Sequence, residues 1–571
     1  MSRPPLSRLV ALLAAMLVSF GAIFVRLTVL QVSQAASLRE LALEQRLRTV
    51  ELPATRGAIV DRNGEPLAVS LEARDVYADP RYVQDPWATA AVLAPLLGRG
   101  RAELAGLLRE ETSFVYLARQ VDLDLAERIA ALGLPGVGFL PSSRRSYPAG
   151  SLAAQVLGFV GVDGVGLAGL ELEYEDELAG TPGERTQEID PLGQPIAGGI
   201  DVERPPIPGA TVVTTIDRDL QYRAERALEE HVRVNRARGG TVIVMDVRTG
   251  DLLAVANYPW FDPNTFAEAS PDTYRNRAVT DAFEPGSTNK VITAAAAVDR
   301  GAVGLREVFS VPWEMRVGGY TIHDAHPHGV LRMTLGDIIA ESSNIGSVLV
   351  AQRVGAPAMA AYLDRFGLGR PTGLGFPGES PGILPPLYAW TGSSLATISY
   401  GQGIAATPLQ MTAVYAAIAN DGRWVQPRLV RGIRDPREGS IPAPAPRTRR
   451  VVARETAAVI ARMLAHAVES GTGANAAIPG YQVAGKTGTA RIPAPDGSGY
   501  LRGQYIASFI GFLPASEPRV VIAAILDRPA TDYGGVAAAP LFQEVARAAI
   551  TRLGIEPGRP LPPPPTAGVA R

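Results

Sequence analysis

The longest apolar stretch of this chain lies at its N-terminus. Residues 9–30 are almost entirely hydrophobic, and Arg26 is their one charge. About 20 residues are enough for a helix to span a bilayer, and an arginine near the end of the span can reach the interface. We therefore expect residues 1–8 to be a short cytoplasmic N-terminus and residues 9–30 to be a transmembrane anchor, since two arginines precede the span.

A cleaved signal peptide is the alternative interpretation of this stretch, with small residues at Ala35 and Ala36. The apolar run is longer than the core of a usual signal peptide, and no small-x-small site follows it closely. We expect a retained anchor that leaves everything beyond about residue 30 outside the cytoplasm.

Residues 31–200 show a mixed pattern and are predicted to form an N-terminal pedestal domain of the dimerisation type. Residues 37–50 are predicted as a helix, and residues 56–68 as two strands joined at the Asn63-Gly64 turn. The charged residues within 31–200 are interpreted as solvated surface and hairpin structure, because this region contains no group of residues typical of a catalytic site. Helical periodicity marks residues 87–97, 101–109 and 123–132.

Residues 190–209 contain four glycines and five prolines, and we place the linker to the next domain at residues 201–209. Residues 210–556 then begin and end with strand patterns and have helices between them. This order predicts an α+β domain in which an antiparallel sheet, closed by the terminal segments, is flanked by helices. We expect residues 557–571, which include four consecutive prolines, to be a disordered tail.

Within residues 210–556, alternating or continuous apolar runs predict strands at 241–247, 252–256, 481–489, 505–513 and 519–527. Helical spacing predicts helices at 217–238, 335–354, 357–366, 408–420, 456–469 and 540–553.

Composition excludes several classes of function. The chain carries 55 Lys+Arg and 57 Asp+Glu, so its formal net charge of −2 offers no global basic field for nucleic acid. It has no cysteine, which excludes disulfides, a thiol nucleophile and cysteine-ligated metal.

The clearest candidate catalytic motif lies at the predicted start of a helix, with a serine hydroxyl at the N-terminal end of that helix. Pro285 and Gly286 form a turn, and the residues after Ser287 run apolar and alanine-rich. Ser287 and Lys290 are then three residues apart, as neighbours on one helix face. A serine becomes a nucleophile when a base lies nearby, and a lysine amine can act as that base if its pKa is lowered.

Lysine usage strengthens this interpretation. Only two of the 55 cationic residues are lysines, Lys290 and Lys486, and all the others are arginines. An arginine-rich genome accounts for the general replacement. Arginine cannot deprotonate in a protein whereas lysine can, so the two remaining lysines mark positions where arginine fails.

Two further motifs follow in the chain. Ser342-Ser343-Asn344 supplies a hydroxyl and an amide, and Lys486-Thr487-Gly488 lies in a strand-like run. With Ser287-x-x-Lys290 they form the three-part signature of the penicillin-recognising serine acyl transferases, in the right order and including both lysines.

Nearly the whole chain beyond the anchor resembles the class B penicillin-binding proteins, which are single-pass, extracytoplasmic peptidoglycan D,D-transpeptidases. The segments 478–489 and 533–535 are most similar to the division (septal) branch, and the elongation branch of lateral wall synthesis is the near alternative. The other segments that carry the resemblance are 56–68, 158–171, 283–288, 400–403, 407–410, 471–473 and 485–490.

The resemblance implies a role for each residue of the first two motifs. Ser287 would attack the D-Ala-D-Ala carbonyl of a stem peptide and release the terminal D-Ala. Lys290, deprotonated by burial and by a neighbouring cation, would be the base. Ser342 would relay the proton to the leaving amine, and Asn344 would hold the substrate amide.

The third motif is implied to bind the donor. Lys486 would add positive potential, Thr487 and Thr489 would bind the terminal carboxylate, and Gly488 would let the substrate approach closely. The backbone N–H groups of Ser287 and Thr489 would form the oxyanion hole. The implied mechanism needs no cofactor and no metal.

The same resemblance implies the setting of the reaction. The catalytic domain would lie on the periplasmic side of the inner (cytoplasmic) membrane and act on lipid-linked and nascent peptidoglycan. An amine of a second stem peptide would attack the acyl-enzyme to form the crosslink, and β-lactams would acylate Ser287 and stay. A polytopic glycan-polymerising membrane protein and other divisome or elongasome proteins are the implied partners, and nucleic acid is not.

Three other functions share the signature. A serine β-lactamase deacylates with water through an added carboxylate, but Glu341, beside Ser342, is interpreted as surface. The anchor and the large N-terminal domain argue against that hydrolase and against a D,D-carboxypeptidase. A non-catalytic β-lactam sensor or scaffold is the remaining alternative, although only about eight residues precede the anchor for signalling.

Two charged clusters stand outside the signature. His323, His326 and His328 are three of the five histidines of the chain. Such a tract can bind metal, but we interpret it as a loop bordering the substrate cleft. Residues 447–450 are interpreted as a solvated basic loop, with contact to anionic lipid or glycan as the alternative.

Overall fold

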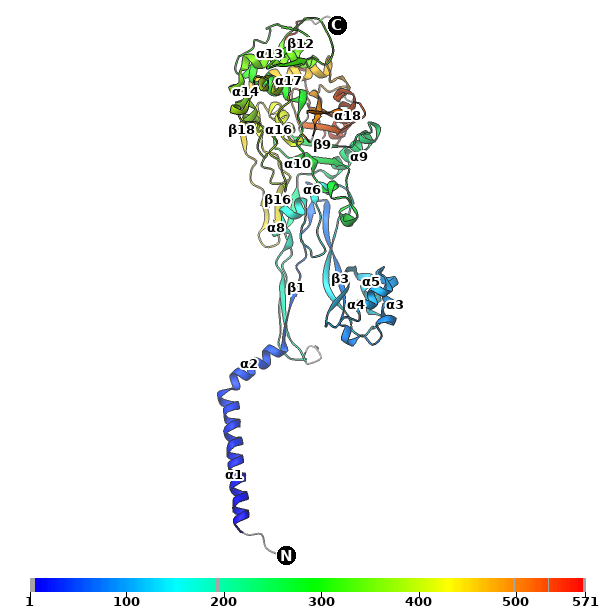
Figure 1. The fold of residues 1–571 in the computed structure, drawn as a ribbon, viewed down its shortest axis with the longest axis vertical. Coiled ribbons are helices and arrows are strands. Elements are labelled where there is room, and N and C mark those ends of the chain that lie inside the picture. Colours follow the sequence, from blue (N-terminus) through cyan, green and yellow to red (C-terminus); the bar gives the residue numbers. More distant parts are fainter. Residues whose placement is uncertain (1–5, 191–195, 495, 497–498, 532, 568–571) are drawn as a thin grey trace. The chain divides into compact units, whose positions relative to one another are not determined.

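The structure is a computed structural model that describes residues 6–190, 196–494, 496, 499–531 and 533–567, with only the backbone of residues 37, 39 and 42–45 (Figure 1). It contains two compact units. One comprises residues 1–55 with 180–208, and the other comprises residues 56–179 with 209–571.

The smaller unit begins with the predicted apolar helix. Helix α1 (Leu6–Thr28) continues through the π-helical turn η1 (Val29–Ser33), and this stretch is the one helix among the described residues that is long and apolar enough to cross a membrane. Helix α2 (Ala35–Arg46) follows. The predicted helix over residues 37–50 therefore ends four residues early.

The same unit contains a three-stranded antiparallel sheet in the order β1-β6-β7. Its strands are β1 (Leu47–Leu52), β6 (Gly183–Glu188) and β7 (Asp201–Arg204). The linker predicted at residues 201–209 is therefore wrong at its start, because residues 201–204 pair with β6. Pairing over such sequence distances, as between Leu47 and Glu188, leaves no local signal in the sequence.

The larger unit joins segments that we predicted to lie in different domains. Strand β8 (Thr211–Thr214) pairs in parallel with β2 (Ile59–Val60) and antiparallel with β16 (Val430–Asp435). Backbone hydrogen bonding thus makes residues 56–179 continuous with residues 209–571, whereas the prediction grouped residues 56–179 with the whole of 31–200. The full sheet runs β17-β16-β8-β2-β3-β4, and β5 also pairs with β3.

The predicted hairpin and the three predicted helices of this segment are present. The elements up to residue 179 are β2 (Ile59–Val60), β3 (Pro66–Ala78), η2 (Pro80–Tyr82), α3 (Pro86–Leu97), α4 (Arg101–Leu107), β4 (Val115–Asp122), α5 (Leu123–Ala130), β5 (Val137–Ser146), α6 (Ala154–Leu157), α7 (Gly169–Glu173) and α8 (Glu175–Ala179).

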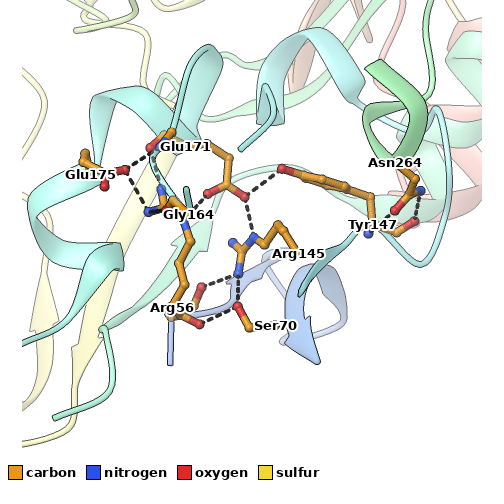
Figure 2. Close-up of polar contacts among 10 residues, drawn as sticks. Arg56, Ser70, Arg145, Tyr147, Gly164, Glu171, Glu175 and Asn264 are labelled. Carbon is orange, nitrogen blue, oxygen red and sulfur yellow. Dashed lines mark hydrogen bonds and ion pairs between the residues drawn. The ribbon is translucent and has the colours of Figure 1, made fainter. Parts of the chain in front are cut away.

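Motif residues from this segment meet in a buried ion-pair network, which Figure 2 shows. Glu171 is fully buried and accepts from Arg56 and from Arg145, each through Nε at 2.7 Å. Tyr147 donates its hydroxyl to Glu171 at 3.2 Å, and its backbone exchanges two hydrogen bonds of 3.0 Å with Asn264. Our interpretation of these charges as solvated surface is wrong for this network, because each has a distant partner inside the unit.

A five-stranded antiparallel sheet forms the centre of the C-terminal part, in the order β10-β9-β21-β20-β19. The predicted closure by terminal segments is confirmed, since strands from both ends of the domain are neighbours. Its strands are β9 (Gly239–Asp246), β10 (Leu252–Tyr258), β19 (Ala484–Pro493), β20 (Tyr500–Leu513) and β21 (Val520–Asp527).

The two faces of this sheet are buried against different helices. Val242 and Val244 of β9 pack with α9 (Arg218–Val234) and α18 (Gly534–Leu553). Ile243 and Met245 instead belong to the core that contains the other helices. Successive side chains of a strand point to opposite faces, so the continuous apolar runs in the sequence correspond to a sheet covered on both sides (Figure 1).

The other helical elements after residue 209 are η3 (Pro263–Glu268), η4 (Pro271–Tyr274), α10 (Arg277–Thr280), η5 (Gly286–Asn289), α11 (Lys290–Asp299), α12 (Leu335–Glu341), α13 (Asn344–Val354), α14 (Ala356–Phe366), η6 (Leu387–Ala389), α15 (Ser394–Ser399), α16 (Pro408–Ala419), α17 (Arg454–Glu469) and η7 (Ala474–Ala476). Short two-stranded pairs are formed by β11 (Phe309–Val311) with β14 (Leu331–Met333), β12 (Glu314–Val317) with β13 (Tyr320–His323) and β15 (Arg423–Val425) with β18 (Thr448–Arg450), while β17 (Gly439–Pro442) extends the larger sheet.

The proline-rich tail is not disordered over its described part. Pro564 is buried, and residues 561–567 form hydrogen bonds with residues of α12 and with Gln482. Composition misled the prediction here, because proline also favours an extended conformation that can lie along a surface.

Candidate active site

Residues 285–289 form the turn that carries the predicted nucleophile Ser287, called the nucleophile turn, and close contact between backbones holds this turn in place. Gly286 has a φ of 53° and donates its N–H to the carbonyl of Gly401 at 3.1 Å. A Cβ at Gly401 would lie 2.1 Å from the Gly286 oxygen, so only glycine fits there. Ser287 consequently lies in the 3₁₀ turn η5, and Lys290 is the first residue of α11. Ser287 and Lys290 are therefore neighbours in a helical segment, as predicted. Ser287, however, lies in a 3₁₀ turn and Lys290 in an α-helix.

Lys290 is completely buried beside the second motif. Its Nζ atom donates to the carbonyl oxygen of Ser342 at 2.5 Å and to Oδ1 of Asn344 at 2.8 Å. The Ser342 hydroxyl oxygen lies 3.3 Å away. Burial lowers the pKa of Lys290 well below its usual range, and the positive charge of Lys486 lowers it further, against the opposing effect of Asp324.

The second motif breaks what we predicted to be one helix over residues 335–354. Ser342 ends α12 with a φ of 62°, in the left-handed region that non-glycine residues seldom adopt. Ser343 then starts α13, and its side chain accepts from the N–H of Gly346 at 2.8 Å. Helical periodicity continues across the break, so the sequence did not reveal it. At this break the Ser342 carbonyl and hydroxyl oxygens both lie within hydrogen-bond distance of Nζ of Lys290.

The carboxylate of Asp324 stabilises the break between α12 and α13 through hydrogen bonds. Its Oδ1 atom accepts the backbone N–H groups of Asn344 and Ile345, the latter at 3.0 Å. Its Oδ2 atom accepts the Ser343 hydroxyl at 2.7 Å and lies 3.1 Å from Nε2 of His328. Asp324 is buried, with 6% of its surface exposed. We did not predict its role, although it lies inside the histidine tract that the sequence singled out.

The histidine tract therefore borders the candidate site, as expected. The carbonyl of His323 accepts from Nδ2 of Asn344 at 3.1 Å, which fixes the orientation of the Asn344 amide. His326 is exposed. Within the part of the chain that the structure describes, His328 contacts the second motif only through Asp324, and the His323 ring lies beside Trp313, with ring centroids 6.0 Å apart.

Strand β19 brings the third motif to the edge of the five-stranded sheet. Lys486 is 1% exposed and donates to the hydroxyl oxygens of Thr472 at 3.0 Å and Thr487 at 3.3 Å. Burial lowers the pKa of Lys486 to about 7, against the opposing effect of the Glu341 carboxylate. Thr472 was noted in the sequence but was not predicted as a site residue.

Glu341 is exposed, as interpreted from the sequence, and its charge still influences two residues near the site. Its negative charge acts on Lys486 and also helps raise the pKa of Tyr533.

The nucleophile turn and β19 are in direct backbone contact. A Cβ at Gly286 would lie 3.1 Å from the carbonyl oxygen of Thr489, and a Cβ at Gly488 would lie 3.2 Å from that of Pro285. Two backbone segments this close can direct two N–H groups at one oxygen atom, which is the arrangement an oxyanion hole requires. Ser287, Lys290, Ser342, Asn344, Lys486, Thr487, Gly488 and Thr489 all lie on segments that meet here.

Glu284 connects the nucleophile turn to two neighbouring segments. Its carboxylate accepts the N–H of Gly403 at 2.8 Å and the hydroxyl of Tyr500, at the start of β20, at 2.9 Å. Burial raises the pKa of Glu284. Burial, and to a smaller extent the Glu284 carboxylate, raise the pKa of Tyr400 to about 12. Glu284 was quoted in the motif but was not predicted to have a role.

Comparisons with known proteins agree with this geometry. Residues 240–547 match the penicillin-binding protein transpeptidase domain, and residues 51–214 match the penicillin-binding protein dimerisation domain. The chain is 38% identical over 567 residues to penicillin-binding protein PbpB of Mycobacterium tuberculosis, covering 93% of this chain and 83% of that one. It is 35% identical over 522 residues to peptidoglycan D,D-transpeptidase FtsI of Escherichia coli, covering 90% and 86%.

A solved structure is also similar over most of the chain. It is penicillin-binding protein 3 of Mycobacterium tuberculosis in complex with aztreonam, with a TM-score of 0.72 and 34% sequence identity, covering 90% of this chain and 100% of that one. A second, in complex with ampicillin, has a TM-score of 0.73.

Proposed function

The chain belongs to the class B penicillin-binding proteins of the division type, and we propose that Ser287 is the residue that carries the acyl group in its peptidoglycan D,D-transpeptidase reaction. The enzyme is a serine-type transpeptidase of cell-wall synthesis.

The state of the Lys290 amine is the observation that carries the proposal. Nζ of Lys290 lies within hydrogen-bond distance of the Ser342 carbonyl, the Ser342 hydroxyl and Asn344 Oδ1. A neutral amine, which burial favours here, donates two N–H groups and has one lone pair that can accept a proton. Ser287 precedes Lys290 by one turn, so its hydroxyl is the group from which Lys290 takes that proton.

In acylation, the Ser287 oxygen bonds to the carbonyl carbon of the penultimate D-Ala while its proton moves to Lys290. The backbone N–H groups of Ser287 and Thr489 stabilise the oxyanion, a contribution of about 3–4 kcal/mol per donor in related chemistry. The C–N bond then breaks, and the proton passes through the Ser342 hydroxyl to the leaving amine of the terminal D-Ala.

The third motif binds the donor. The free carboxylate of D-Ala-D-Ala is held by Thr487 and Thr489 in the positive potential of Lys486, and Asn344 holds the substrate amide. Because β19 is an edge strand, an extended stem peptide adds alongside it. The predicted role of Gly488 in admitting the substrate is replaced by another: the absence of a side chain there lets the turn that carries Ser287 pack against β19, since a Cβ would lie 3.2 Å from the Pro285 oxygen. An amine of a second stem peptide then attacks the ester, forms the crosslink and returns the proton to Ser287. A β-lactam occupies the donor position and leaves Ser287 acylated.

The chain is a single-pass membrane protein by its N-terminal apolar helix and its relatives. We infer that the catalytic domain faces the periplasm, which the two arginines before the span support. A polytopic glycan-polymerising protein of the division machinery is the proposed partner, because a transpeptidase needs freshly made strands as its donors.

Labelling by a fluorescent penicillin tests the assignment. Ser287→Ala should abolish covalent labelling, and peptide mapping of the wild-type adduct should identify Ser287. Ser310→Ala on β11, an exposed hydroxyl remote from the motifs in sequence, serves as the matched control. Undiminished labelling of the Ser287→Ala variant would refute the proposal.

A further inference from the structure

The C-terminal segment takes a defined route over the transpeptidase domain after α18. Gly558 packs against the turn between β20 and β21, where a Cβ would lie 2.4 Å from the hydroxyl oxygen of Ser516. The backbone N–H of Leu561 then donates to Oε1 of Gln482 at 2.7 Å, and Nε2 of Gln482 donates back to the Leu561 carbonyl at 3.3 Å. Residues 561–567, called the strap below, continue from this point to α12.

The strap ends on the first turn of α12. The hydroxyl of Thr334, the N-cap of α12, lies 2.9 Å from the carbonyl oxygen of Pro565 and 2.8 Å from Oδ2 of Asp337, and it can donate to either. Asp337 accepts the N–H of Ala567 at 2.9 Å. Pro564 is buried over Gly336, where a Cβ would lie only 3.1 Å from Pro564 Cγ. The strap is therefore fixed by side chains at both ends and by close packing between them.

These two attachment points belong to the elements that carry two of the catalytic motifs. Gln482 lies four residues before Lys486 in the run that becomes β19. Helix α12 has only seven residues, and Ser342 is its C-cap. A helix this short has little stability of its own, so its position depends on the contacts at its ends.

We propose that the strap is a positioning element of the transpeptidase, which holds α12 and the start of β19 in fixed relation and so keeps Ser342 and Lys486 aligned around Lys290. This rests on the residue roles proposed above. Proline suits the task, because its φ is already restricted and an extended proline run loses little freedom when it docks. The strap acts through α12 and β19 and touches none of the reacting groups.

Two truncations of the full-length chain in detergent test the proposal. Termination after Pro560 removes the strap, whereas termination after Ala567 removes only residues 568–571 and is the matched control. The second-order rate of acylation by a fluorescent penicillin should fall about tenfold in the first chain and stay unchanged in the second, as a small misplacement of catalytic groups predicts. A synthetic peptide Leu-Pro-Pro-Pro-Pro-Thr-Ala should restore the rate, and Leu-Ala-Ala-Ala-Ala-Thr-Ala should not.

A second variant guards against misfolding of the truncated chain. Pro564→Ala with Pro565→Ala, in the full-length chain, should slow acylation while the melting temperature stays unchanged. Equal acylation rates in the truncated and control chains would overturn the proposal. A slower acylation rate that is accompanied by a lower melting temperature, and that the peptide does not restore, would overturn it too. Failure of the underlying function would look different, because the control chain itself would then show no labelling at Ser287.

Discussion

The buried carboxylate of Asp324 accepts the hydroxyl of Ser343 at 2.7 Å, one residue from Ser342 and one from Asn344. Ser343 lies 19 positions after Asp324 in the chain. The same carboxylate holds two backbone N–H groups at the start of α13, so one side chain fixes the turn that presents both proposed catalytic residues to Lys290.

Asp324→Asn should slow acylation by a fluorescent penicillin about 10- to 100-fold, because the amide cannot accept from the Ser343 hydroxyl and from both N–H groups at once. It also removes the negative charge that opposes the lowering of the Lys290 pKa. The rising limb of the pH–rate profile should therefore move to lower pH. His326→Ala, an exposed neighbour, is the control and should match the wild type. A wild-type rate for Asp324→Asn would contradict the positioning role.

Lys290→Arg should reduce acylation to background. Arginine keeps the positive charge but stays protonated in a protein, so it cannot take the Ser287 proton. Stopped-flow acylation measures the loss, and Arg300→Lys, directly after α11, should leave the rate unchanged. Substantial acylation by the arginine variant would mean that another group is the base.

The pH dependence of acylation should be bell-shaped. Lys290 acts as a base only when neutral, so the rate is lost as pH falls through its lowered pKa. Lys486 attracts the donor carboxylate only when charged, so the rate falls again as pH rises through about 7. Lys486→Met should remove this upper limb from the profile, since the side chain then carries no charge that titrates. An upper limb that stays in place would exclude Lys486 as its origin.

Glu284→Gln and Tyr500→Phe should be coupled in their effects on acylation. The two side chains share a 2.9 Å hydrogen bond that ties the start of β20 to the nucleophile turn. A double-mutant cycle should give an interaction energy of about 0.5–3 kcal/mol, the range for residues in direct contact. Strictly additive effects would show that this bond does not transmit position to Ser287.

Glu171→Gln should destabilise the larger unit by about 3–5 kcal/mol, because it leaves two buried arginines, Arg56 and Arg145, without their shared charge (Figure 2). Thermal unfolding followed by circular dichroism measures this change. The control is Asp163→Asn, whose side chain is 75% exposed, and its melting temperature should match the wild type. Equal melting temperatures for both variants would show that the buried network adds nothing to stability.

Sequence patterns predicted most of the regular elements because their causes are local. Apolar periodicity placed α9, α14, α16 and α17 and the strands of the central sheet within a few residues. It failed at Ser342, where the pattern of one helix runs through two. Apolar periodicity also missed the strand at residues 201–204, because its partner strand is β6. For residues 561–567 the prediction of disorder came from proline content alone.

The candidate site was predicted residue by residue through its motifs, and above all through lysine usage. Asp324, Glu284 and Thr472 were missed as site residues for a common reason. An aspartate among histidines, a glutamate before a proline or a threonine between glycines has many ordinary interpretations. Only the partners across space, such as Ser343 for Asp324, give such a residue its role.

By itself the sequence determined the chemistry of this protein, because a serine, two lysines that arginine cannot replace and their fixed spacings leave few alternatives. The tertiary structure decided the state in which that chemistry operates. Burial of Lys290 favours the neutral amine that the proposed mechanism needs, and the left-handed turn at Ser342 directs two acceptors toward it. Desolvation and contacts between distant segments set both features, and neither is encoded in any short stretch of the chain.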